Sequence, residues 1–117
     1  MNYKGEIKEN IYVGLLSVLI LKLLQNESMY GYQIRKELSS RTNNIIQISE
    51  GSLYGPLYRM QNKNFITSEK ILVGSKRFRM YYTITEEGKK YLKEAEEVFQ
   101  EVMFGANNIL KLQPMVN

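Results

Sequence analysis

"SEGSLYGPLYRM", residues 49–60, decides the fold, because it begins like a helix and then carries a Gly-Pro pair. Ser49 is a good helix cap, and Glu50 follows in the first turn, where a negative charge is favoured. Apolar residues recur at i, i+4 and i+7 and predict one buried face: Leu53, Leu57 and Met60. We therefore expect a helix whose other faces meet solvent or a partner.

Two glycines and a proline lie on those other faces. Gly51 and Gly55 are one turn apart, and without side chains they would let the helix backbone approach a partner closely. Pro56 has no N–H group and would kink or widen a helix interior, at a cost of about 3 kcal/mol. Alternatively, the helix proper begins at Pro56, because proline is welcome at the first helical position. Both interpretations remain open at this point.

The chain before this stretch predicts two more helices. Residues 11–25 are apolar on nearly all sides, so we expect a helix that is enclosed on most faces. A second helix should begin after Ser28 and end near residues 42–43, where turn-forming residues collect. Its apolar positions recur at i, i+4 and i+8: Tyr30, Ile34 and Leu38.

From Phe65 onward the apolar period changes to two, which is typical of strands. Residues 66–73 and 77–84 predict a hairpin, with Gly74 in the turn and Lys76 near the tip. One side of the second strand is expected to be half-buried: Phe78, Met80, Tyr82 and Ile84. For Tyr82 we expect a packing role.

A last, long helix should follow Thr85, which can cap it. Its apolar residues recur at spacings of three and four, the heptad period: Leu92, Ala95, Phe99, Val102, Ala106 and Ile109. A small domain cannot cover so much apolar surface, so we expect the stripe to pair with a second copy, joined by Leu15 of the helix at 11–25. The alternative is that the stripe folds back entirely on residues 11–25.

Composition limits the possible functions. The 117 residues are 44% hydrophobic, enough for one compact core. The chain has no Cys and no His, which excludes disulfides, thiolate nucleophiles, imidazole bases and the usual zinc sites. We identify no catalytic residue, metal ligand or cofactor motif, and expect no enzyme. The apolar run at 11–24 is too short to span a membrane and no signal-peptide cleavage site precedes it, so we expect a cytoplasmic protein without a membrane partner.

Positive charge is concentrated in the middle of the chain. Residues 28–85 hold nine Lys or Arg and three Glu, a net charge of +6, whereas the whole chain carries +4. This distribution favours an anionic partner such as DNA. The other explanation is an ordinary solvated surface.

Three helices followed by a charged hairpin are the order of a winged helix-turn-helix, whose third helix enters the major groove of double-stranded DNA. We expect a mainly α fold with a small β-hairpin: a DNA-binding domain at residues 1–85, and a dimerisation helix and tail at 86–117. The candidate DNA contacts lie on the third helix and the hairpin: Ser49, Gly51, Ser52, Tyr54, Gly55, Tyr58, Arg59, Lys63, Lys76, Arg77 and Arg79.

Three motifs resemble the PadR family of bacterial transcriptional regulators: "YGYQI" at 30–34, "SEGSLYGPLYRM" at 49–60 and "RMYYTITEEG" at 79–88. The resemblance spans about residues 10–110, and three motifs in the right order and spacing make it specific. With a single helix after the hairpin, the chain looks like the short subfamily. It implies a homodimeric repressor that binds a palindromic operator and dimerises through its last helix. It also implies that Ser52 and Tyr54 contact DNA and that Arg79 belongs to the basic strand of the hairpin.

Some short members of the family resemble multidrug sensors, in which a Trp from each last helix stacks on a planar aromatic ligand. This chain has no Trp, and Phe99 takes that place in our register, with Glu96, Val102 and Met103 nearby. A role for Phe99 in plain core packing is the competing interpretation. For the whole protein, the alternative to a repressor is an adaptor that uses the same fold to bind protein without sequence-specific DNA binding.

Overall fold

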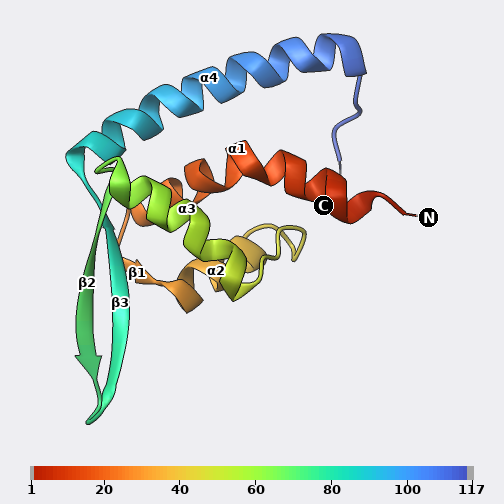
Figure 1. Cartoon of the computed structure of the whole chain (residues 1–117). Coiled ribbons are helices and arrows are strands. Elements are labelled where there is room, and N and C mark those ends of the chain that lie inside the picture. Colours follow the sequence, from red (N-terminus) through yellow and green to blue (C-terminus); the bar gives the residue numbers. More distant parts are fainter. Residues whose placement is uncertain (1, 116–117) are drawn as a thin grey trace.

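The computed structural model describes residues 2–115, and over these residues it contains four helices and one antiparallel sheet (Figure 1). In chain order the elements are α1 (Lys4–Leu24), β1 (Met29–Tyr30), α2 (Gly31–Ser40), α3 (Glu50–Asn62), β2 (Ile66–Val73), β3 (Arg77–Ile84) and α4 (Glu86–Leu110). The mainly helical class and the winged helix-turn-helix order are confirmed.

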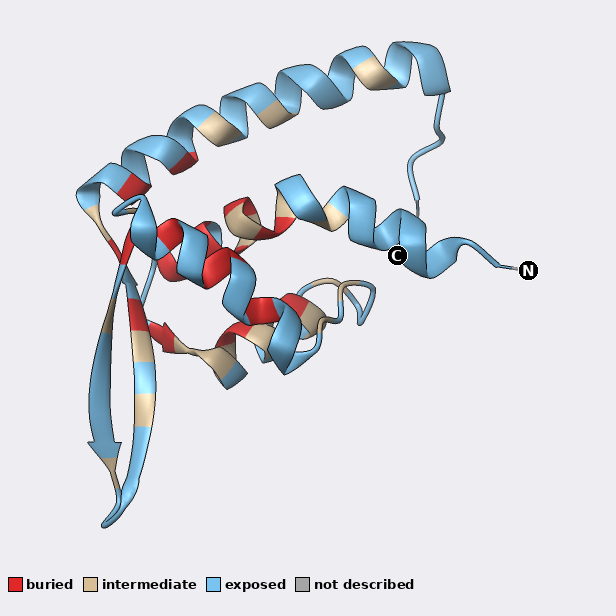
Figure 2. Ribbon diagram, in the orientation of Figure 1, coloured by how far each residue is buried: buried red, intermediate tan, exposed pale blue. Residues whose placement is uncertain are grey.

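The hydrophobic core lies where the carboxyl-terminal half of α1 meets α2, α3 and the base of the sheet (Figure 2). Its largest fully buried side chains come from every one of these elements and from the start of α4: Ile20, Leu21, Leu24, Ile34, Leu53, Leu57, Ile66 and Leu92. The predicted buried face of α3 is confirmed, because Leu53, Leu57 and Met60 are each at most 3% exposed.

Helix α3 begins at Glu50, and the side chain of Ser49 accepts a hydrogen bond from the backbone N–H of Ser52 at 3.1 Å. The helix continues through Pro56, which is buried, so the expectation that Pro56 lies on a face toward solvent or a partner is wrong, while Gly51 and Gly55 are exposed as expected. The interpretation in which the helix begins at Pro56 is therefore wrong. The cap at Ser49 lies seven residues before Pro56, so the first turn needs no separate start.

The sheet has the order β1-β3-β2, and the predicted hairpin is confirmed with its register from Ile66 opposite Ile84 to Val73 opposite Arg77. Gly74 adopts φ +78° in the turn, which a residue without a side chain tolerates. The third strand, β1, was not predicted. It pairs Met29 with Tyr82, so the second helix begins at Gly31 rather than directly after Ser28.

The β2–β3 hairpin, called the wing from here on, projects away from the helices (Figure 1). Tyr82 and Ile84 at its base are buried, which confirms the packing role of Tyr82. Phe78 and Met80 are 54% and 41% exposed. The expectation that all of this side is half-buried is wrong for the outer half of the wing, because that half extends beyond the core.

Helix α1 is longer than predicted, since it begins at Lys4 rather than at residue 11. Its amino-terminal half lies on the surface (Figure 2), where Ile11 and Val13 are 57% and 75% exposed. The expectation of a helix enclosed on most faces, made for residues 11–25, is therefore wrong for residues 11–15. It holds only from Leu16 onward, where α1 packs into the core.

Helix α4 is attached tightly to the end of α3. Thr85 caps α4 by accepting from the N–H of Gly88 at 2.9 Å, and its own N–H donates to the carbonyl oxygen of Phe65 at 3.0 Å. A methyl group on Gly88 would overlap that same carbonyl oxygen. Farther along, Lys22 of α1 pairs with Glu96 of α4 at 3.0 Å. Only the first half of α4 is thus fixed to the domain.

The second half of α4 is largely exposed to solvent in the described part of the chain (Figure 2). Val102 and Ile109 are 58% and 84% exposed. The alternative in which the stripe folds back entirely on residues 11–25 is wrong for the single chain. Among the described residues, no helix is long and apolar enough to cross a membrane.

Candidate nucleic-acid interface

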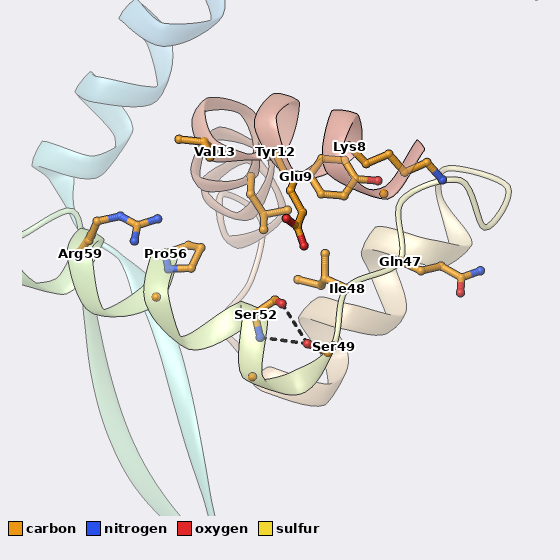
Figure 3. A pocket seen from close by; sticks show the side chains of 14 residues that line it. Lys8, Glu9, Tyr12, Val13, Gln47, Ile48, Ser49, Ser52, Pro56 and Arg59 are labelled. Atoms are coloured by element: carbon orange, nitrogen blue, oxygen red, sulfur yellow. Dashed lines mark hydrogen bonds between the residues drawn. The ribbon is translucent and has the colours of Figure 1, made fainter. Parts of the chain in front are cut away.

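The outer side of α3 carries most of the residues that the sequence selected. Tyr54, Tyr58, Arg59 and Lys63 are all exposed, as are the two glycines between them. Tyr54 is on the side of α3 toward the wing, where it lines a cavity with Phe78. Arg59 is on the opposite side, toward α1 (Figure 3). The helix therefore presents aromatic hydroxyl groups on one flank and a guanidinium on the other.

The two serines at the start of α3 are bonded to each other. Ser49 accepts from the N–H of Ser52, and its hydroxyl donates to the Ser52 hydroxyl at 2.9 Å (Figure 3). The Ser52 hydroxyl is thus held in place and keeps its own proton to donate. A side chain that is already oriented loses little conformational freedom when it binds.

Gly51 and Gly55 border an open cavity of about 560 Å³ between the first half of α1 and the start of α3 (Figure 3). A methyl carbon on Gly51 would reach no closer than 4.0 Å to the Ser49 hydroxyl, whereas on Gly55 it would lie 3.3 Å from an Arg59 nitrogen. The charged groups around the cavity are of both signs: Lys8, Glu9 and Arg59. This mixture indicates no single class of ligand.

The wing carries basic groups along its length. Lys76 and Arg77 are exposed at the tip, and the Lys70 ammonium lies 5.0 Å from the centre of the Phe78 ring. Arg79 is half-buried, with its guanidinium carbon 4.2 Å from the centre of the Tyr30 ring. None of these four residues makes an ion pair in the described part of the chain. Their charges are available to an anionic partner.

Helix α2 adds residues that sequence reasoning missed. Arg35 donates from Nε to the carbonyl oxygen of Ile48 at 3.1 Å and so holds the loop that leads into α3. Tyr32 and Lys36 are exposed beside it. The apolar pattern of the second helix identified Arg35 and Lys36 only as polar positions. The "YGY" sequence, which contains Tyr32, gave no reason to place these residues beside α3. Their proximity comes from the packing of α2 on α3.

A second cavity, of about 300 Å³, separates α3 from the wing. Tyr54 and Glu50 both line it, and the hydroxyl of Tyr54 donates to Oε1 of Glu50, one turn earlier, at 3.1 Å. This hydrogen bond and, less strongly, burial raise the pKa of Tyr54 above its ordinary value. Both side chains are thereby oriented at the start of α3.

The candidate dimer and ligand residues differ in how far their own chain buries them. Leu92 is buried in the core of its own chain, and Leu15, Ala95, Phe99 and Ala106 are half-buried. Val102, Met103 and Ile109 are exposed. Glu96 pairs with Lys22 through Oε1 at 3.0 Å, and both side chains are exposed. The described residues contain no group of acidic or other ligand side chains that could hold a metal ion.

Comparison with known proteins agrees with this architecture. Residues 20–94 match the model of the transcriptional regulator PadR-like family. An uncharacterized protein of Lysinibacillus sphaericus is 38% identical over 96 residues, which are 82% of this chain and 88% of that protein. A transcriptional regulator of Clostridium thermocellum is 30% identical with a TM-score of 0.79, over 85% of this chain and 96% of its own.

A third similar structure is that of Bacillus subtilis PadR in complex with operator DNA. It is 22% identical with a TM-score of 0.63, over 88% of this chain and 51% of that one. At this identity the likeness shows a shared fold. The fold is therefore one that a DNA-bound protein uses.

Proposed function

The chain belongs to the transcriptional regulator PadR-like family, and we propose that it acts as a homodimeric repressor of a palindromic operator. Membership makes it a DNA-binding transcriptional regulator and not an enzyme. The observation that carries the proposal is the set of basic groups on α3 and the wing, which lack acidic partners in the described structure. A DNA-binding regulator of this kind would act in the cytoplasm.

The proposed DNA contacts have two roles. Lys63, Lys76 and Arg77 are long exposed side chains, and they would bind phosphates and supply affinity without reading sequence. Ser52 and Tyr54 would face the base edges, because recognition helices read bases near their amino-terminal end. Arg59, in the last turn of α3, is a further candidate for a base contact, through its long side chain. Gly51 and Gly55 would let the backbone approach the groove. In this division residues 1–85 bind DNA and residues 86–117 hold two such domains together.

The proposed dimer rests on α4. The exposed stripe from Val102 to Ile109 follows a heptad spacing and belongs to a helix of 25 residues. Heptad stripes of this kind bury their apolar side chains against a second helix. A two-fold pair of α4 helices would place two copies of α3 on one face of the DNA, as a palindromic operator requires.

A ligand site between the paired α4 helices is a finer part of the proposal. Val102 and Met103 are exposed beside the half-buried Phe99, so a planar aromatic compound would find apolar walls there. Phe99 also packs against the core of its own chain, which favours a packing role. Calorimetric titration of the protein and of a Phe99→Ala variant with planar aromatic compounds tests the site. Equal heats for the two proteins would contradict it.

The main experiment is a binding titration with DNA from upstream of the protein's own gene and with a scrambled duplex of equal length. We expect tighter binding to the upstream DNA and a footprint made of two symmetric half-sites. Affinity should fall steeply as salt rises, because each neutralised phosphate releases counterions. Equal affinity for the two duplexes at every salt concentration would contradict a sequence-specific repressor.

A further inference from the structure

An acidic side chain lies in the first turn of α3, on a surface that otherwise presents basic groups. Glu50 is exposed, and in the described part of the chain it makes no ion pair. It lines the same cavity as Arg35 and Arg79. A carboxylate on a surface that approaches phosphates lowers affinity by repulsion. Glu50 therefore opposes DNA binding unless it has a specific partner in the DNA.

Helix stability gives Glu50 one role but leaves room for a second. A negative charge is favoured near the start of a helix, but the side chain of Ser49 already accepts the N–H of Ser52 there. An uncharged residue at position 50 would leave this cap in place. The charge adds the modest stabilisation of a first-turn carboxylate, about 0.3–1 kcal/mol, and this role does not engage a particular oxygen of the side chain.

The geometry gives the carboxylate one free oxygen. Tyr54 donates its hydroxyl proton to Oε1 of Glu50 at 3.1 Å, and no hydrogen bond to Oε2 occurs among the described residues. Because the partner lies one turn along the same helix, the carboxylate is held to the outer surface of α3. The second oxygen is an acceptor at the helix end whose residues read base edges.

The hydrogen-bonding groups of the major groove limit which base the Glu50 carboxylate can contact. A carboxylate only accepts hydrogen bonds, and in the groove only the amino groups of cytosine and adenine donate them. Adenine places its N7 acceptor beside its amino group, and N7 would repel the carboxylate. Guanine offers two acceptors, and thymine offers an acceptor and a methyl group. Cytosine alone presents a donor without a neighbouring acceptor on its own edge.

We propose that Glu50 reads one cytosine in each operator half-site through the carboxylate oxygen that Tyr54 leaves free. The inference rests on the proposed function, because it requires α3 to enter the major groove. It assigns Tyr54 a positioning role in addition to any contact of its own. Glu50 would weaken binding to all other sequences and so sharpen the choice of operator.

The test is selection of bound duplexes from a randomised DNA library with the full chain and with a Glu50→Gln variant. The natural protein should favour cytosine at one position of each half-site by roughly tenfold. The variant should lose that preference, keep the preferences at the other positions and bind random DNA more tightly, because it lacks one negative charge. Glutamine can also donate, so adenine should gain at the same position.

Two further variants make the test specific. Glu69→Gln removes the same charge from the exposed part of the wing, and it should tighten binding without changing any base preference. Tyr54→Phe removes only the hydroxyl that holds Oε1, and it should weaken the cytosine preference while the melting temperature stays unchanged. If Glu50→Gln and Tyr54→Phe both select the same bases as the natural protein, Glu50 does not read DNA.

The outcomes also separate this inference from the proposed function. A natural protein that selects no sequence from the library contradicts the proposed repressor and the inference together. A natural protein that selects a palindrome, with an unchanged palindrome for Glu50→Gln, contradicts the inference alone. An equal loss of preference at every position would also overturn it, because that result indicates a structural role for Glu50.

Discussion

The guanidinium of Arg79 lies over the ring of Tyr30, with 4.2 Å between its central carbon and the ring centre. The two residues are 49 positions apart in the sequence, and the pairing of β1 with β3 brings them together. Tyr30 is also 5.4 Å from Tyr81, ring centre to ring centre. Arg79 is thus a cation of the wing whose position is set by the start of α2.

Tyr30→Leu should weaken DNA binding, because Arg79 loses the ring that orients it. Cation–π contacts at exposed sites contribute about 0.5–1 kcal/mol, so we expect a loss of that order in binding free energy. Tyr30→Phe keeps the ring and should bind as the natural protein does. Fluorescence anisotropy with labelled operator DNA measures both variants. Equal weakening by Phe and Leu would show that the hydroxyl, rather than the ring, matters.

Reversing the charges at the wing tip should reduce both affinity and its salt dependence. In Lys76→Glu/Arg77→Glu two cations become anions, and the slope of log affinity against log salt should fall by about 2. A matched control is Lys90→Glu/Lys93→Glu on α4, which makes the same change in net charge on exposed residues outside the wing. Titrations at several salt concentrations compare the two. Similar slopes for both variants would indicate that the wing makes no phosphate contacts.

A charge on the α4 stripe should separate the proposed dimer. Ile109→Asp places a carboxylate at a position that is 84% exposed in the single chain, so the isolated fold should tolerate it. In a paired seam the same charge would be buried without a partner, at a cost of several kcal/mol. Sedimentation velocity at micromolar concentration should show a monomer. The control, Gln100→Asp, lies outside the stripe and should remain dimeric.

Gly88→Ala should destabilise the fold strongly. The added methyl group would overlap the backbone carbonyl oxygen of Phe65, and overpacking of this kind costs about 1–3 kcal/mol or more. Gly14→Ala in α1 is the control, because nothing lies within 4 Å of the added atom. It should be neutral or slightly stabilising, by about 0.5–1 kcal/mol. Urea unfolding followed by circular dichroism measures the difference.

Stability should also fall at high pH because of Tyr82. Burial raises the pKa of Tyr82 above its ordinary value of 10.0, so the unfolded chain loses this proton at a lower pH than the folded one. The stabilisation is complete below pH 10 and is lost as pH rises through the folded pKa. Tyr82→Phe removes this dependence. Between pH 8.5 and 11 the urea midpoint of the natural protein should therefore fall relative to that of Tyr82→Phe, after correction for their difference at neutral pH.

Local signals made α3 and the wing predictable. Ser49 caps its helix within three residues, and the buried face of α3 follows from the spacing of Leu53, Leu57 and Met60. The wing follows from the change to an apolar period of two and from Gly74 in the turn. Each of these features depends on neighbours in the sequence, which is why reasoning from the sequence alone found them.

Features that depend on distant contacts were missed. Strand β1 has two residues, too few for any period, and it exists because β3 offers an unpaired edge. The contact of Arg79 with Tyr30 follows from that pairing. The exposed half of α1 was predicted to be enclosed because its apolar residues resemble those of the buried half, and periodicity cannot say where a neighbouring element ends. Arg35 gained its place beside α3 from helix packing.

Close contacts among Phe65, Thr85 and Gly88 fix the start of α4 to the DNA-binding domain, so the two should move together. This junction joins the end of α3 to the start of a helix of 25 residues, which is about 37 Å long at a rise of 1.5 Å per residue. In the proposed dimer, a change of about 5° in the angle between two such helices would move their far ends by roughly 3 Å. Because the contact between Phe65 and the start of α4 is tight, each DNA-binding domain would move together with its α4 helix. The distance between the two α3 helices would therefore change.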